Sequence, residues 1–209
     1  TRGVIAGGDV RNNPAGTDIP VNTIDYITMA STGDAVDFGD ASDAVRNASC
    51  GSSPTRGVMM GPQRGAPSTS NSNTIEYITI STTGNSSDFG DTSTADNSAS
   101  GIISNAIRAV RFTSSYAPNT DDEIDYLTIA TLGDSVDFGD AIKTGTHRGG
   151  FSNSIRGGAA GGFVSPGDHN TIEYVNIATT GDGIEFGDMT ITRAYNMGTT
   201  SDSHGGLSE

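Results

Sequence analysis

Two short stretches decide the fold of this chain: Ile24-Asp25-Tyr26-Ile27-Thr28-Met29 and Asp37-Phe38-Gly39-Asp40. Each occurs four times with small variations, and in every copy the Phe follows the Tyr after 12 residues. The four pairs are Tyr26 and Phe38, Tyr77 and Phe89, Tyr126 and Phe138, and Tyr174 and Phe186. Successive Tyr residues are 51, 49 and 48 residues apart. This spacing predicts a tandem array of one structural unit.

A looser element, an Arg that opens a short apolar or Gly-rich stretch, precedes each Tyr. These residues are Arg2, Arg56, Arg108 and Arg156. The distance from Arg to Tyr varies (24, 21, 18 and 18 residues), so insertions fall between these two elements. We expect a single repeat domain over residues 1–209. Its units run approximately over 1–54, 55–106, 107–154 and 155–203, and 204–209 start a further unit or close a ring.

Each unit is predicted to form four short strands, which in the first unit are Gly3–Ala6, Thr23–Ala30, Val36–Gly39 and a weaker stretch at Ala44–Ser49. Their β-branched and aromatic residues favour strands. The second strand is apolar on both faces apart from one acid, which indicates a sheet covered by neighbours on both sides. The fold class is therefore all-β, with four-stranded blades stacked or arranged radially.

The composition excludes several classes of protein. Only 33% of the residues are apolar, and the formal net charge is −14. The single cysteine excludes an internal disulfide framework, and no apolar run approaches the roughly 18 residues of a membrane-spanning helix. Nonspecific nucleic-acid binding depends on Lys and Arg, which are scarce here. We expect neither a nucleic-acid partner nor membrane insertion.

The order of these elements is similar to the kelch motif of β-propellers. Gly7-Gly8 and Gly161-Gly162 lie where kelch repeats have a double glycine, the repeated Tyr residues resemble the kelch Tyr, and the Phe residues take the place of its Trp. The similarity covers nearly the whole chain. It implies a kelch-like β-propeller, or a propeller segment, of four four-stranded units of about 48–51 residues.

A more specific resemblance rests on Asn73–Ile80 and Ser31–Asp40. These stretches resemble tandem repeats of structural and tail-associated proteins of marine bacteriophages, especially cyanophages, and of related marine bacterial surface proteins. The resemblance implies a virion or extracellular location and no catalytic activity. It implies other virion proteins or host-surface glycans as partners, and it is compatible with an oligomeric assembly.

Three acids recur in each unit, one before Tyr, one before Phe and one after Phe-Gly. A catalytic acid–base pair would be unique rather than repeated. We interpret these acids as solvated strand edges and turn caps. The alternative is a calcium site in which Asp34, Asp37 and Asp40 converge; otherwise we expect no cofactor.

The remaining repeated residues have structural interpretations. We expect each Phe to be buried between units and each following Gly to permit a bulge. The repeated Arg is predicted to pair with a repeated acid. Cys50 has no evident base partner, and Gly101, Gly150 and Gly198 are its expected counterparts, so we interpret it as a small side chain.

The predicted function is non-enzymatic: a structural or adhesive module that presents loops of variable length to a partner. These loops are 12–21, 61–73, 116–123 and 164–170, and the candidate binding residues in them are Tyr116, His169 and Asn170. A glycan-binding lectin is the first alternative and would require an equivalent aromatic-plus-acid pocket in each unit. An enzyme on a propeller scaffold is the second and would require one cluster of polar residues.

Overall fold

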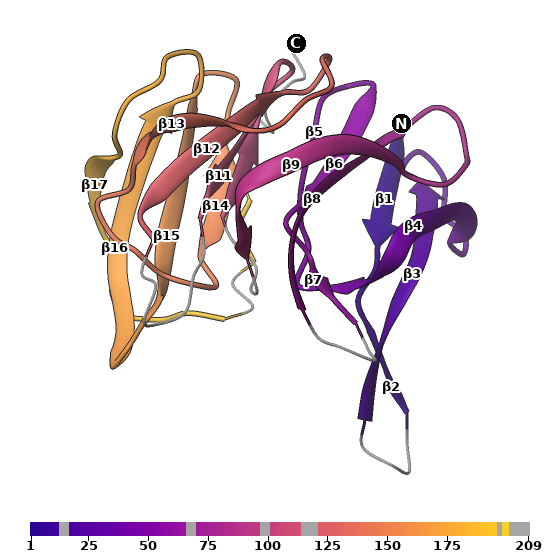
Figure 1. Cartoon of the computed structure of the whole chain (residues 1–209), viewed down its shortest axis with the longest axis horizontal. Coiled ribbons are helices and arrows are strands. Elements are labelled where there is room, and N and C mark those ends of the chain that lie inside the picture. The colour runs from indigo at the N-terminus through magenta and orange to yellow at the C-terminus, as the bar shows by residue number, and fades with distance from the viewer. Residues whose placement is uncertain (13–16, 66–69, 97–100, 114–120, 196–197, 201–209) are drawn as a thin grey trace.

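A computed structural model describes residues 1–12, 17–65, 70–96, 101–113, 121–195 and 198–200. All regular structure in these residues is β-strand (Figure 1), which confirms the all-β fold class. We number the units 1 to 4 by their Tyr–Phe pairs.

The strands follow the repeat. Unit 1 contains β1 (Arg2–Ala6), β2 (Asp9–Asn12), β3 (Thr17–Thr28) and β4 (Val36–Arg46). Unit 2 contains β5 (Ser49–Ser52), β6 (Arg56–Met60), β7 (Gln63–Arg64), β8 (Ser70–Thr79) and β9 (Ser87–Asp96). Unit 3 contains β10 (Ile102–Ser104), β11 (Arg108–Phe112), β12 (Glu123–Thr128) and β13 (Val136–Asp140). Unit 4 contains β14 (Gly149–Ser152), β15 (Arg156–Val164), β16 (Gly167–Asn176) and β17 (Ile184–Asp188).

Units 3 and 4 each form a four-stranded antiparallel sheet in chain order, β10-β11-β12-β13 and β14-β15-β16-β17. In unit 2 the strands β5, β6, β8 and β9 pair in the same way. The short strand β7 pairs with both β4 and β8, so units 1 and 2 join into one curled nine-stranded sheet (Figure 1). The sheets are open, and β1 is an edge strand because β3 is its only partner among the described strands.

The first three strands predicted for unit 1 coincide with parts of β1, β3 and β4. The predicted fourth strand, 44–49, is not a separate strand, because it is divided between the end of β4 and the start of β5. The strand β5 follows the weak stretch 44–49, yet it pairs with β6 of the next unit. Each sheet of units 2 to 4 therefore begins one strand before the repeated Arg. The pairing also corrects the counterparts of Cys50. Cys50 is opposite Met59, and the same place in unit 3 is taken by Ile102, not Gly101.

A β-bulge recurs in every unit. Ile24 is opposite Gly39 and Asp25 is opposite Asp37, which leaves Phe38 without a counterpart on β3. The same register shift follows the equivalent Ile of the other units, namely Ile75, Ile124 and Ile172. A bulge bends a strand and redirects a side chain. In units 1 to 3 it also leaves the Phe carbonyl free of its own ladder, so that this carbonyl accepts a bond from the next unit. The predicted role of the Gly is confirmed.

The hydrophobic core lies between units rather than within them. One cluster joins Ile24, Phe38 and Val45 of unit 1 to Met59 of unit 2. A second cluster joins units 2 and 3, and a third joins units 3 and 4. A single repeat cannot bury its own apolar face, so stacking of neighbours is what stabilises the array.

Candidate functional site

The most regular site of the molecule is the contact between each unit and the next. Gly84 N donates to the carbonyl of Phe38 over 2.7 Å, and Ser86 N donates to that of Asp40 over 2.9 Å. In return, Asp40 N donates to Oδ1 of Asn85 over 3.0 Å. The bulge of one unit is thus paired, backbone to backbone, with a turn of the next.

The same three bonds recur twice along the chain. Between units 2 and 3 they join Phe89 and Asp91 to Gly133, Asp134 and Ser135. Between units 3 and 4 they join Phe138 and Asp140 to Gly181, Asp182 and Gly183.

Close approach explains the glycine in the bulges of units 1 to 3. Gly39 has a φ of 147°, which disfavours other residues, and a Cβ there would lie 2.4 Å from the carbonyl oxygen of Gly84. Gly90 and Gly139 meet the next unit in the same way. Gly187 of unit 4 has a similar φ of 142°, but a Cβ there would meet nothing within 4 Å.

The repeated Arg also connects neighbours, but not through an acid. The guanidinium of Arg2 lies 4.4 Å from the ring centroid of Tyr26, and its Nη1 donates to the carbonyl of Ile80 in unit 2 over 2.8 Å. Arg56 and Arg108 repeat this arrangement with the carbonyls of Ile129 and Ile177. The predicted Arg–acid pairing is therefore wrong. The positive charge rests on an aromatic face and a main-chain oxygen instead.

The acid before Tyr is a buried hydrogen-bond acceptor in units 2 to 4. Glu76, Asp125 and Glu173 are 3%, 0% and 0% exposed. Glu76 accepts from Ser42 N of unit 1 over 3.2 Å, and Glu173 accepts from Ile142 N of unit 3 over 2.7 Å. For this acid the solvated-edge interpretation is wrong. It holds for the acid before Phe, which is exposed in all four units.

Two of these buried acids also pair with a buried Arg. Asp125 accepts two bonds from Arg111, at 2.9 and 2.7 Å, and Glu173 accepts one from Arg148. Both pairs are almost fully removed from solvent. Removal of one partner from such a pair leaves an uncompensated buried charge.

The predicted convergence of Asp34, Asp37 and Asp40 on a metal ion is not found. All three side chains are exposed, and no group of three or more His, Cys, Asp or Glu residues in the described part of the chain is arranged to hold a metal ion. The counterparts of Asp34 are Asn85, Asp134 and Asp182, which accept the backbone bond described above. The side chain at this position joins units instead.

The candidate loop residues have different positions from those expected. Tyr116 lies outside the described residues. His169 and Asn170 lie within β16 rather than in a loop, and Asn170 donates to the carbonyl of Met189 over 3.2 Å. Burial, together with the positive charge of Arg148, lowers the pKa of His169 to about 4. Both residues are half-buried and belong to the long β15–β16 ladder.

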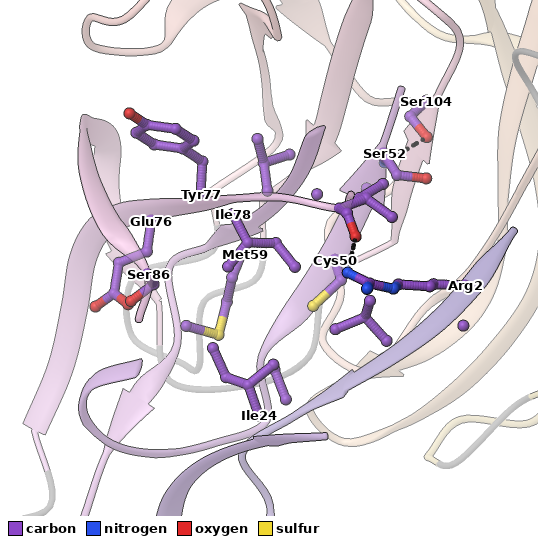
Figure 2. A pocket seen from close by; sticks show the side chains of 17 residues that line it. Arg2, Ile24, Cys50, Ser52, Met59, Glu76, Tyr77, Ile78, Ser86 and Ser104 are labelled. Carbon is purple, nitrogen blue, oxygen red and sulfur yellow. Dashed lines mark hydrogen bonds between the residues drawn. The ribbon is translucent and has the colours of Figure 1, made fainter. Parts of the chain in front are cut away.

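A pocket of about 350 Å³ lies between units 1 and 2, beside the free edge of β1 (Figure 2). In Figure 2 the guanidinium of Arg2 lies beside Cys50, and Met59 lies near Ile24. Cys50 is exposed to this pocket, but the surrounding atoms desolvate its thiol and raise its pKa to about 11. A thiol with this pKa is protonated at neutral pH, so the pocket does not activate Cys50 as a nucleophile.

The insertions between Arg and Tyr lie along one edge of the array. They include β7 and the β2–β3 hairpin, which projects at the bottom of Figure 1. The turn between β15 and β16 lies at the lower end of unit 4, where the Arg-to-Tyr distance is the shortest. On the hairpin, Val10 is opposite Ile19 in register, and these side chains are 56% and 44% exposed. This edge therefore combines variable length with exposed apolar side chains.

No protein-family model matches this chain, and no curated protein matches it. Within the described residues, no helix has the length and hydrophobicity needed to cross a membrane.

Some functional residues were missed by sequence reasoning although a signal was present. A Gly followed by Asp or Asn precedes each Phe by the same distance, as in Gly33-Asp34 and Gly84-Asn85. This pair is typical of a turn, and in units 2 to 4 it is also the half of the contact that receives the preceding bulge. The buried Arg111 and Arg148 had no such signal because they are not repeated.

Proposed function

We propose that this chain is a non-enzymatic structural and adhesive module, a kelch-like propeller segment that displays its variable edge on a phage particle or another extracellular surface. One observation supports this function above all: the repeated residues are used for contacts between units, whereas the insertions gather along one edge. A scaffold with this division tolerates changes in its loops without changes in its core.

The β2–β3 hairpin is the strongest candidate for contact with a partner. It protrudes from the array, and Val10 and Ile19 form an exposed apolar pair on it. Single exposed apolar residues need no explanation, whereas contiguous exposed apolar surface marks interaction sites. Val10 and Ile19 are neighbours across the ladder and so contribute to one such surface. The partners we propose are host-surface glycans or neighbouring virion proteins.

The test is binding of the purified chain to host-type cell surfaces and to a glycan array, with Ca²⁺ and with a chelator. The variant Val10→Ser/Ile19→Ser is expected to lose binding while its folding is unchanged. Val136→Ser is the matched control, since Val136 is 55% exposed but belongs to the fixed part of the repeat. Saturable binding to one class of glycan would favour the lectin alternative. Equal loss in both variants would contradict the assignment to the hairpin.

A further inference from the structure

The two ends of the array expose opposite halves of the contact that joins its units. At the unit 4 end, Phe186 is 65% exposed, whereas Phe38, Phe89 and Phe138 are 2–3% exposed. The guanidinium of Arg156 rests on Tyr174 at 4.8 Å, as its counterparts do on their own Tyr residues. Among the described residues it has no carbonyl partner of the kind that Arg2, Arg56 and Arg108 have.

The unit 1 end exposes the complementary half. Met29 is 64% exposed, whereas its counterpart Ile80 is partly buried and its counterparts Ile129 and Ile177 are 1% and 0% exposed. Ile5 is 58% exposed and occupies the place of Met59, which is buried. Asp25 is only partly buried, although the same acid in units 2 to 4 is buried and accepts bonds from the preceding unit.

From this complementarity we propose that a second copy of this chain docks head to tail, with unit 4 of one copy against unit 1 of the next. The occupant is a second copy because both halves of a contact that is already made three times within the chain are present on each molecule. The inference does not depend on the proposed display function.

The internal contacts give the register of this docking. Gly33 N and Ala35 N of one copy would donate to the carbonyls of Phe186 and Asp188 of the other, as Gly84 and Ser86 do within the chain. Asp188 N would donate to the side chain of Asp34, by analogy with Asp40 and Asn85.

Two side-chain contacts of the docking follow in the same way. Arg156 would donate to the carbonyl of Met29, and Asp25 would accept from Thr190 N. Gly33 lacks the positive φ of Gly84, Gly133 and Gly181, so its backbone has to rotate on docking.

The pocket beside β1 fits a strand from the same second copy. Cys50, Ser52 and Gly57 line it. In the next unit their counterparts Ile102, Ser104 and Ala109 lie against Gly51 of β5. The pocket is therefore the place where a strand equivalent to β5 or β10, paired with the free edge of β1, would lie against unit 2.

Residues 198–200 of the chain are the equivalent of such a first strand. They follow Asp188 at the distance at which β5 follows Asp40. Thr199 Oγ1 donates to the carbonyl of Gly150, so this segment lies on β14 of its own copy. Its small side chains suit a pocket lined by Cys, Ser and Gly. Head-to-tail docking would thus give β1 a partner strand from the second copy.

A contact between two different surfaces of the same chain is heterologous, so repeated docking forms a closed ring or an open filament. Neither end of the array is self-complementary, which distinguishes this mode from a two-fold symmetric dimer.

The test is sedimentation velocity of the full chain over a series of concentrations. Wild type is expected to associate, and Phe186→Asp and Met29→Asp are each expected to be monomeric. Val136→Asp is the control, because this side chain is about as exposed but lies on neither end face. An equimolar mixture of Phe186→Asp and Met29→Asp is expected to form a one-to-one dimer and nothing larger, since each retains the end that the other lacks.

Three results would overturn the proposal. The first is a wild-type chain that stays monomeric at every concentration. The second is a mixture of the two variants that stays monomeric while wild type associates, which would indicate a symmetric contact. The third is a monomeric wild type whose folding is strongly destabilised by Phe186→Asp, which would show that the end faces close on each other within one chain.

Discussion

Phe138 and Phe186 have similar local sequences, the same bulge and almost the same contact with their own Tyr. Their ring centroids lie 5.7 and 6.1 Å from those of Tyr126 and Tyr174, at interplanar angles of 82° and 90°. Yet Phe138 is 2% exposed and Phe186 is 65% exposed. The difference comes entirely from the next unit, which covers the first ring and not the second. The repeat therefore encodes one half of an interface rather than a self-contained core.

The largest difference is expected from truncation of these two rings. Phe138→Ala removes a fully buried ring and leaves a cavity between units 3 and 4, at a cost of about 3–5 kcal/mol. Phe186→Ala changes a mostly exposed side chain and should cost less than about 1 kcal/mol. Urea denaturation at a concentration where the chain is monomeric gives both values. Similar losses would mean that the ring is held by its own unit and not by its neighbour.

The second difference concerns the glycine of the bulge. Gly139→Ala and Gly187→Ala share the strain of a positive φ, at 145° and 142°. Only at Gly139 does a Cβ collide with the next unit, at 2.5 Å from the carbonyl carbon of Gly181. We expect Gly139→Ala to be the more destabilising by about 1–3 kcal/mol, the usual cost of overpacking. The difference between the two free energies of unfolding isolates the contact because the backbone strain cancels.

Sequence reasoning succeeded where a residue acts through its own repeat. The β-branched and aromatic residues predicted an all-β chain and Gly39 predicted a bulge, and both of these predictions are confirmed. It failed where the partner is a main-chain atom of the neighbouring unit. The carbonyl of Ile80, which receives Arg2, has no signature in the sequence. An acid was the natural guess for a repeated Arg, and it was wrong.

The buried ion pairs could not be predicted for a different reason. Arg111 occupies a place that is taken by Ile5 in unit 1 and Met59 in unit 2. Comparison of the copies therefore shows that this Arg is not repeated, but it does not predict an ion pair. Its partner Asp125 is repeated, but the repeat alone does not distinguish a solvated acid from a buried one. That distinction depends on the covering unit, as it does for Phe186.

A smaller difference is expected for the repeated Arg. Arg108→Gln loses both the contact with Tyr126 and the bond to the carbonyl of Ile177 in unit 4. Hydrogen bonds to charged groups contribute about 1.5–3 kcal/mol and exposed cation–π contacts about 0.5–1 kcal/mol. Arg156→Gln loses only the contact with Tyr174, so its cost should be about 0.5–1 kcal/mol. Equal costs in denaturation would show that the bond between units contributes nothing.

The smallest expected effect concerns His169, which is half-buried in unit 4, in contrast to Phe186 on the exposed face of the same unit. The pKa of His169 is about 4, below its ordinary value of 6.5, because burial and then the charges of Arg148 and Lys143 disfavour the imidazolium, although Asp168 opposes them. Between these two pH values the unfolded chain binds a proton at this position and the folded chain does not. The free energy of unfolding therefore falls as the pH is lowered through this window.

His169→Gln should flatten that dependence, by clearly less than the roughly 1.4 kcal/mol per pH unit of a complete difference in protonation, because the ring is only half-buried. Burial also lowers the pKa of His147 below its ordinary value of 6.5, so His147→Gln should reduce the pH dependence in the same direction. Denaturation of wild type and both variants from pH 7 to pH 4.5 measures the two contributions against the shared background of carboxylates. If the free energy of unfolding of the wild type does not change across this range, neither histidine is shielded from protons in the folded chain.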